Sequence, residues 1–114
     1  DSMEEGVANF HLWFLVNLSR FLGFYPGNEY TSGAWFDACE GSYTVQKPPH
    51  ATVMTPENAR LMNDFVECDV RCLAEIGLNR TQRSALLEAL LAYYGYHLDA
   101  IHAVQSVRIL QEVF

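Results

Sequence analysis

The stretch Asn9–Pro26, NFHLWFLVNLSRFLGFYP, reads as a helix with almost no polar face. Apolar side chains cover nearly its whole circumference, and only His11, Asn17, Ser19 and Arg20 interrupt them. A helix that is apolar all round must be covered all round, so it lies at the centre of a domain or a partner covers one side of it. It is too short and too interrupted to span a bilayer, which takes about 20 predominantly apolar residues. We therefore predict a buried central helix.

Gly23 and Pro26 mark the C-terminal end of this helix. Glycine commonly follows the last helical residue because it adopts the left-handed conformation that caps a helix. Proline a few residues later keeps the helix from resuming. The first helix is therefore expected to end just before Gly23.

The composition indicates one ordinary domain. The chain has 114 residues, and 50% of them are hydrophobic, which is enough to bury a sizeable core. Lys and Arg together number 7 against 14 Asp and Glu, so the formal net charge is -7. Phosphate binding needs clustered cationic side chains, and this balance argues against nucleic-acid binding by this segment alone.

Two further features bear on the cellular setting. The first residues, Asp1–Glu5, are acidic, and no small-residue cleavage site follows an apolar stretch, so no signal peptide is expected. The three cysteines are an odd number and lack the spacing of a disulfide framework. Both features predict a cytoplasmic, reducing environment.

A small β region follows the first helix. Gly27–Gly33 is a polar loop, Ala34–Val45 reads as a hairpin with its turn at Glu40–Gly41, and Gln46–Thr52 is a connector. Two strands alone are marginally stable, so we expect the hairpin to pack against the helices.

The second half of the chain is predicted to be helical. Thr55 and Pro56 suit the cap and the first position of a second helix, which continues to about Gly77 with or without a break near Asp69.

A third helix is expected over about Arg80–Leu98, opened by a capping box from Asn79 to Gln82, and a short fourth over about Val104–Val113. The predicted fold is mainly α: a small helical bundle around a central apolar helix, with one short β-hairpin.

Several short groups of residues, in order over nearly the whole chain, carry a resemblance to a known family. They are Phe10-His11-Leu12, Phe14-Leu15, Leu18 and Leu22–Pro26 in the first helix, Phe36-Asp37 with Gly41 and Tyr43, Thr55-Pro56-Glu57, Tyr93-Tyr94 with His97, and Ser106-Val107, Leu110-Gln111-Glu112 and Phe114. With these residues the chain resembles the C-terminal helical domain of RecO, a recombination mediator in bacterial DNA repair.

The resemblance implies a set of partners. RecO works with RecR, and often RecF, to load RecA onto single-stranded DNA coated by single-strand-binding protein, and it anneals complementary strands. Family members begin with an OB-fold domain, and residues 1–114 contain no series of alternating strands that resembles one. The chain is therefore expected to be the C-terminal domain alone. Most of the contact with single-stranded DNA is then expected to come from the N-terminal domain.

In the family, the helical domain is implicated in holding the acidic, phenylalanine-ended tail of single-strand-binding protein. Such a site needs an apolar pocket for the terminal ring and a cation for the carboxylate. The expected cations are Arg20 and Arg108, and the expected walls are Trp13, Phe21 and Leu110. The alternative is that Arg20 is a solvated helix residue whose stem packs over apolar neighbours.

The chain differs from related sequences in one charged position and in its cysteines. Related sequences often carry a lysine before the serine of the last helix, where this chain has Gln105. Some members hold zinc with two cysteine pairs around the hairpin, whereas Cys39 is alone there. Cys68 and Cys72 could in principle chelate with Cys39 or His50, but a structural zinc site takes four ligands, and free cysteines commonly pack as small apolar residues. No metal or other cofactor is expected.

Catalysis and a general docking role are the rival functions. His97 and His102 flank Asp99, but a five-residue spacing does not place two imidazoles on one helix face. His11 is expected to be a hydrogen-bonded core histidine, and no nucleophile elbow or phosphate loop is present. We therefore expect a non-enzyme.

The aromatic content also fits a generic helical protein-interaction module with no repair role. In addition, part of the first helix or of the Tyr93-Tyr94 region is expected to pack against residues outside this chain, which would leave an apolar patch and self-association in the isolated chain.

Overall fold

The computed structural model describes the backbone of residues 2–27, 29–50 and 52–113, and the side chains of residues 9–99 apart from 28, 51, 70 and 74. The first helix, α1, spans Ser2–Leu22 and so begins well before Asn9. Its end is as predicted: Gly23 has a φ of 94°, and the N–H groups of Gly23 and Phe24 both donate to the Ser19 carbonyl at 3.0 Å. These two bonds satisfy a carbonyl that the helix end would otherwise leave unpaired.

The predicted hairpin is part of a three-stranded antiparallel sheet. Strand β1 (Trp35–Asp37) lies between β2 (Ser42–Thr44) and β3 (Val53–Met54). Gly41, with a φ of 71°, forms the turn where the sequence predicted it. The sequence did not predict β3, because two residues are too few to show the alternation of a strand.

The second helical segment is broken where a break was considered. Helix α2 spans Pro56–Glu67, and a short 3₁₀ helix, η1, spans Val70–Glu75. Thr55 caps α2 by accepting the Asn58 N–H at 3.3 Å, and Asp69 caps η1 by accepting the Arg71 N–H at 2.9 Å. An Asp in this role favours a new helix start over a continued helix, because its carboxylate takes the backbone donor that a continuing helix would use.

The prediction of separate third and fourth helices is wrong. Helix α3 runs without interruption over Arg80–Val113. Its start is as predicted, since Asn79 and Gln82 exchange reciprocal backbone–side-chain hydrogen bonds of 2.8 and 3.0 Å, which form a capping box. Residues 99–103 contain neither Gly nor Pro, so nothing local ends the helix there.

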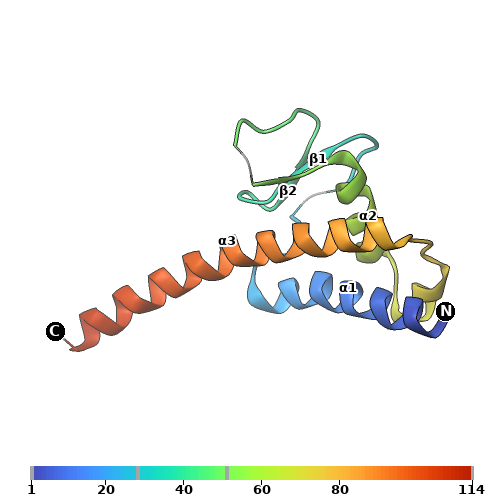
Figure 1. The fold of residues 1–114 in the computed structure, drawn as a ribbon. Coiled ribbons are helices and arrows are strands. Elements are labelled where there is room, and N and C mark those ends of the chain that lie inside the picture. Colours follow the sequence, from blue (N-terminus) through green and yellow to red (C-terminus); the bar gives the residue numbers. More distant parts are fainter. Residues whose placement is uncertain (1, 28, 51, 114) are drawn as a thin grey trace.

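Helix α3 lies between α1 and the sheet, and α1 and α3 run side by side in the same direction (Figure 1). Tyr94 on α3 donates from its hydroxyl to the Leu15 carbonyl on α1. About one turn further along α3, a ring nitrogen of His97 lies 2.7 Å from the Ala38 carbonyl in the turn that follows β1. The domain is therefore mainly helical, with a small sheet packed on it.

The core is built around aromatic rings that pack edge to face. The Tyr93 ring meets Phe24 at a centroid distance of 5.3 Å and Phe36 at 5.2 Å, both edge-to-face. Tyr93 and Phe36 are essentially fully buried. Edge-to-face pairs gain roughly 0.5–1.5 kcal/mol each beyond burial of area. This cluster links the end of α1, the sheet and α3 into one core.

Helix α1 is not covered all round, so the prediction of a fully buried central helix is wrong. Leu12, Val16 and Ser19 are buried, but Phe10, Phe14 and Phe21 are 42%, 49% and 85% exposed. The alternative considered from the sequence, a helix with one side left for a partner, describes this arrangement. None of the helices in the described part of the chain has the length and apolar character that crossing a membrane requires.

Candidate protein-docking site

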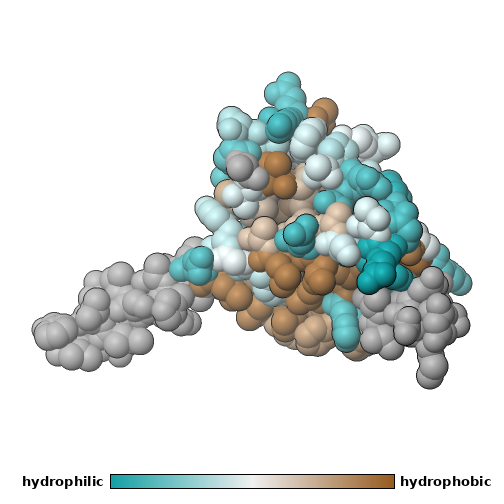
Figure 2. Space-filling view, viewed as in Figure 1, coloured by the Kyte–Doolittle hydropathy of each residue, from teal (hydrophilic) through white to brown (hydrophobic). Residues whose placement is uncertain are grey.

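An apolar face extends along α1 and the adjoining part of α3. On α1 it consists of the exposed rings of Phe10, Phe14 and Phe21, and the first two stack with a centroid distance of 6.3 Å. These residues share one side of the helix because each lies close to a whole number of turns from the others. Figure 2 shows apolar side chains gathered over this region.

Helix α3 contributes leucines to the same region. Leu87, Leu91 and Leu98 are 40%, 54% and 42% exposed and lie on one side of α3 at helical spacing. They are adjacent to α1, because Tyr94, beside them on the helix surface, contacts the Leu15 carbonyl. Contiguous exposed apolar surface of this kind marks binding sites in soluble proteins.

A small pocket lies next to this face, between α1 and α3, and Leu87 belongs to both. It is lined by His11 and Leu12 from α1 and by Arg83, Ser84 and Leu87 from α3, with a volume of about 150 Å³. The Nη1 atom of Arg83 is buried and has no hydrogen-bond partner among the described residues. Arg83 is half-buried and lines the pocket, so it offers a cation there for an acidic ligand.

Arg83 was not among the site residues expected from the sequence, and His11 was expected to have a different role. His11 is exposed and lines this pocket, so the prediction of a core histidine is wrong. Arg83 lies in the first turns of α3, where a cation is common on a solvated face. Only the packing of α3 against α1 brings the two residues together.

The residues that the sequence did select are separated. The Arg20 guanidinium lies 4.6 Å from the centre of the Tyr25 ring, and Trp13 donates its indole N–H to the Cys68 carbonyl at 2.9 Å. Phe21 lies about 100° around the helix from Arg20, because consecutive residues are separated by that angle. Leu110 and Arg108 lie on α3 outside the residues whose side chains are described.

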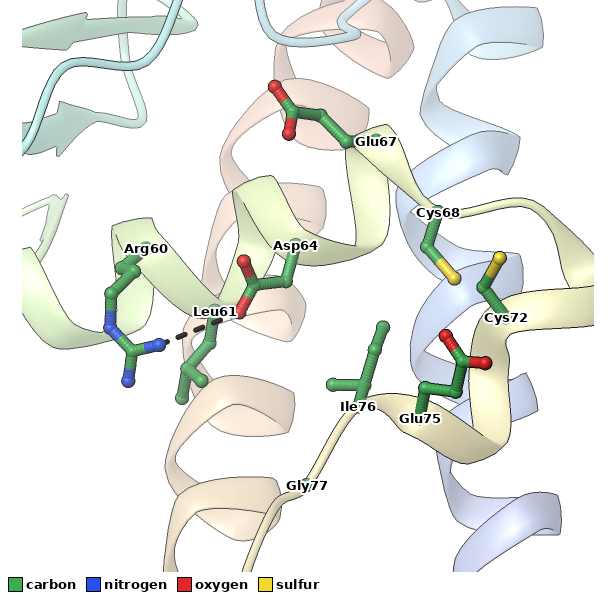
Figure 3. A pocket seen from close by; sticks show the side chains of 9 residues that line it. All are labelled: Arg60, Leu61, Asp64, Glu67, Cys68, Cys72, Glu75, Ile76 and Gly77. Atoms are coloured by element: carbon green, nitrogen blue, oxygen red, sulfur yellow. Dashed lines mark ion pairs between the residues drawn. The ribbon is translucent and has the colours of Figure 1, made fainter.

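A second pocket, of about 400 Å³, lies between α2 and η1 (Figure 3). Its lining includes three carboxylates, Asp64, Glu67 and Glu75, with Arg60 paired to Asp64 at 3.6 Å. Burial raises the pKa of Asp64, and Glu67 adds to this, while Arg60 opposes it. An acidic pocket of this kind repels an acidic ligand.

The cysteines do not gather into one site. Cys68 and Cys72 line the acidic pocket, and Figure 3 shows their sulfur atoms close together. Cys39 lies with Asp37 and His50, and within the described residues this is the group of three whose donor atoms fall within 4.8 Å of one another. The chelation considered from the sequence, by Cys68 and Cys72 with Cys39 or His50, therefore has no counterpart among the described residues.

The histidines have separate partners. His97 stacks on Phe24 at 4.8 Å and contacts the Ala38 carbonyl, whereas His11 lines the pocket against α3. His50 pairs with Asp37 at 3.0 Å. His102 lies outside the residues whose side chains are described. Within that part of the chain, the histidines do not converge on one cleft.

Comparison with known proteins places the chain in one sequence family. Residues 1–103 match the family described as "Recombination protein O C terminal". The protein named DNA repair protein RecO from Azobacteroides pseudotrichonymphae is 32% identical, over 98% of this chain and 47% of the relative. The proteins of the same name from Bacteroides fragilis and Porphyromonas gingivalis are 34% and 27% identical over 100% of the chain.

The chain spans about half the length of these curated relatives, 48% for both the B. fragilis and the P. gingivalis proteins. No solved structure matches it. The similarity extends through α1, the sheet, α2 and most of α3, so it includes both sides of the pocket between α1 and α3.

Proposed function

The chain belongs to the family of RecO C-terminal domains, and we propose from this that it acts in recombinational DNA repair as a non-catalytic docking domain. Its partners are then the C-terminal tail of single-strand-binding protein and RecR, within the reactions that load RecA and anneal strands. Contact with single-stranded DNA comes mainly from an N-terminal domain of the longer protein. The net charge of -7 supports this division, because a net acidic domain is a poor binder of phosphates.

The observation that carries the proposal is the pocket between α1 and α3. An acidic tail that ends in phenylalanine needs an apolar cavity next to a cation. Leu12 and Leu87 supply apolar walls, and Arg83, which lines the same pocket, supplies the cation for the terminal carboxylate. Such a charge-assisted hydrogen bond contributes roughly 1.5–3 kcal/mol.

Arg20 and Arg108, with Trp13, Phe21 and Leu110, remain the second proposed location for the tail. Arg20 is exposed, and its stacking on Tyr25 leaves guanidinium N–H groups for a ligand. The Trp13 indole N–H already donates to the Cys68 carbonyl, so that ring could serve only through its apolar surface. The Arg83 pocket is favoured, because its walls and its cation lie together.

The test is titration of the chain with a peptide that copies the acidic, phenylalanine-ended tail. We expect saturable binding that weakens with salt and weakens roughly tenfold in Arg83→Ala. Arg60→Ala is the matched control, because Arg60 is also on a helix surface but pairs with Asp64 in the acidic pocket. A peptide with its terminal phenylalanine replaced by alanine tests the apolar part of the site.

Two outcomes would change the proposal. A loss of binding in Arg20→Ala or Arg108→Ala, with Arg83→Ala unaffected, would move the tail to the other location. No binding by the folded chain would refute docking of the tail on this domain, while membership of the family would stand.

A generic interaction module is the second candidate function, and the exposed rings of Phe10, Phe14 and Phe21 favour it. A partner held by these rings would bind through burial of apolar area, with little dependence on salt. Binding that is insensitive to both salt and Arg83→Ala would support this function over tail docking.

A further inference from the structure

Three polar side chains from separate segments meet beside the β1–β2 turn. Asp37 is the last residue of β1, Cys39 lies in the turn, and His50 comes from the connector between β2 and β3. Their donor atoms all lie within 4.8 Å of one another. The Asp37 side chain is 15% exposed and that of His50 is 36% exposed, so the group lies at the surface and small molecules can reach it.

The hydrogen bonds around His50 determine which ring nitrogen carries the proton. The Thr52 N–H donates to Nδ1 at 3.2 Å, so Nδ1 is the acceptor and the neutral ring carries its proton on Nε2. The Nε2–H group then donates to Asp37 Oδ1 at 3.0 Å. The basic nitrogen, Nδ1, lies 3.8 Å from the Cys39 sulfur. The thiol therefore faces a base, and a carboxylate holds that base in the required tautomer.

Neighbouring residues also interact with Asp37 and with Cys39. Burial raises the pKa of Asp37, but the Glu40 N–H and His50 lower it more, so the net pKa is lowered and the carboxylate stays ionised to stabilise a protonated His50. From α3, the Tyr96 hydroxyl forms a hydrogen bond with Cys39, and this bond leads the causes that raise the tyrosine pKa. The Thr52 N–H shares the Nδ1 acceptor with the thiol.

We propose that Cys39 is a nucleophilic thiol that reacts with small, soft electrophiles, with His50 accepting its proton. In the reaction with an alkyl halide, the S–H proton moves to Nδ1 and the sulfur lone pair attacks the carbon. A C–S bond forms, the carbon–halogen bond breaks, and the halide leaves with its electron pair. His50 then releases the proton to water. Tyr96 donates to the sulfur while it carries negative charge.

The chain contains its own comparison thiols. Cys68 donates to the Asp69 carbonyl at 3.0 Å, and its pKa is raised by burial and further by Cys72, Asp69 and Glu75. Cys68 and Cys72 both line the acidic pocket of Figure 3. Since the thiolate is the reactive form, carboxylates around a thiol slow its reaction with electrophiles.

The test is limited alkylation of the reduced 114-residue chain with iodoacetamide at pH 7, followed by peptide mass spectrometry for each cysteine. Cys39 is expected to react about tenfold faster than Cys68. His50→Asn keeps an acceptor for the Thr52 N–H but cannot take a proton, so it should remove most of that difference. The same substitution at His11, which lies on α1, is the matched control.

The pH dependence of the alkylation rate at Cys39 separates activation by His50 from simple exposure of the thiol. In His50→Asn and Asp37→Asn the rate should rise steeply from pH 6 to about pH 9, as for an ordinary thiol, whereas the natural chain should show a much flatter profile. Asp37→Asn retains an acceptor for the Glu40 N–H, so it serves if His50→Asn does not fold. The proposal is overturned if Cys39 in the natural chain reacts no faster than in the urea-unfolded chain. It is also overturned if the folded variants keep the natural rate and profile.

Discussion

Tyr93 and Tyr94 occupy neighbouring positions on α3, are both buried, and yet differ in how their hydroxyl groups are satisfied. The Tyr94 hydroxyl donates to the Leu15 carbonyl and so joins α3 to α1. The Tyr93 hydroxyl is buried without a hydrogen-bond partner among the described residues, although its ring is central to the aromatic core. Burial raises the pKa of both side chains, so both are neutral at physiological pH. Because both rings are buried, the Tyr93-Tyr94 region is not the surface that was expected to pack against residues outside this chain.

This difference predicts opposite effects for one chemical change. Tyr94→Phe removes a hydrogen bond and leaves the Leu15 carbonyl short of a donor, so it should lower the free energy of unfolding by about 1 kcal/mol. Tyr93→Phe removes a buried, unpaired hydroxyl and should leave that free energy unchanged or raise it by up to about 1 kcal/mol. Urea unfolding of both variants checks this. A larger loss in Tyr93→Phe than in Tyr94→Phe would contradict it.

At the scale of elements, hydrogen bonds of polar side chains join segments that are distant in the sequence. Asn9 on α1 is buried, and its amide donates to the Leu73 and Ile76 carbonyls at 2.9 and 3.0 Å, which ties η1 to α1. In the sheet, Asp37 accepts the Glu40 N–H at 3.0 Å and pairs with His50, which joins the connector to the turn. Short strands have few ladder hydrogen bonds, so these side-chain bonds matter for the hairpin.

The lowered pKa of Asp37 predicts how the stability of the hairpin depends on pH. The folded protein binds the Asp37 proton less tightly than the unfolded chain does, so acid favours unfolding. The stabilisation is complete above the ordinary pKa of 3.8 and is lost as the pH falls through the lowered value. Asp37→Asn should cost about 1–2 kcal/mol at pH 6 and much less near pH 2, because protonation has the same effect as the substitution.

Unfolding of the natural chain and of Asp37→Asn across that range measures the difference directly. Asp64→Asn is the comparison, because the pKa of Asp64 is raised and its removal should not reproduce this acid dependence. A cost of Asp37→Asn that is the same at both ends of the range would contradict the assignment.

At the scale of the whole molecule, the apolar face on α1 and α3 is the feature that the fold leaves unused. The sheet and α2 cover other sides of the two helices, whereas Phe14, Phe21 and Leu91 are at least half or nearly half exposed. An apolar surface of this kind is a binding surface or a cause of association. In a chain that spans about half of its curated relatives, it is a place where the rest of a longer protein or a partner can pack.

We expect the isolated chain to self-associate through this face. The double substitution Phe14→Ser and Phe21→Ser should reduce association strongly and leave stability nearly unchanged, because both rings are exposed. Val45→Ser is the control, since Val45 is 79% exposed but lies just after β2, away from the face. Sedimentation equilibrium measures the association. A monodisperse natural chain would contradict the prediction.

The sequence by itself determined the features that depend on neighbours in the chain. The Gly23 cap, the Thr55 and Asn79 caps and the turn at Gly41 each rest on contacts a few residues apart, and each lies where it was predicted. The family resemblance likewise followed from residues in order along the chain, and the match over residues 1–103 confirms it. Where a local signal was absent, the prediction failed: a helix end was wrongly placed near residues 99–103, and the two-residue β3 was not predicted.

Only the tertiary structure decided which surfaces are open and which distant side chains meet. A helix that is apolar nearly all round does not encode which side its neighbours cover, so the exposure of Phe10, Phe14 and Phe21 could not be read from α1 alone. The same is true of His11 with Arg83, which are 72 positions apart in the chain, and of Cys39 with His50. Such pairs are set by how α3 packs against α1 and how the connector folds back on the hairpin, which depends on the burial of the whole core.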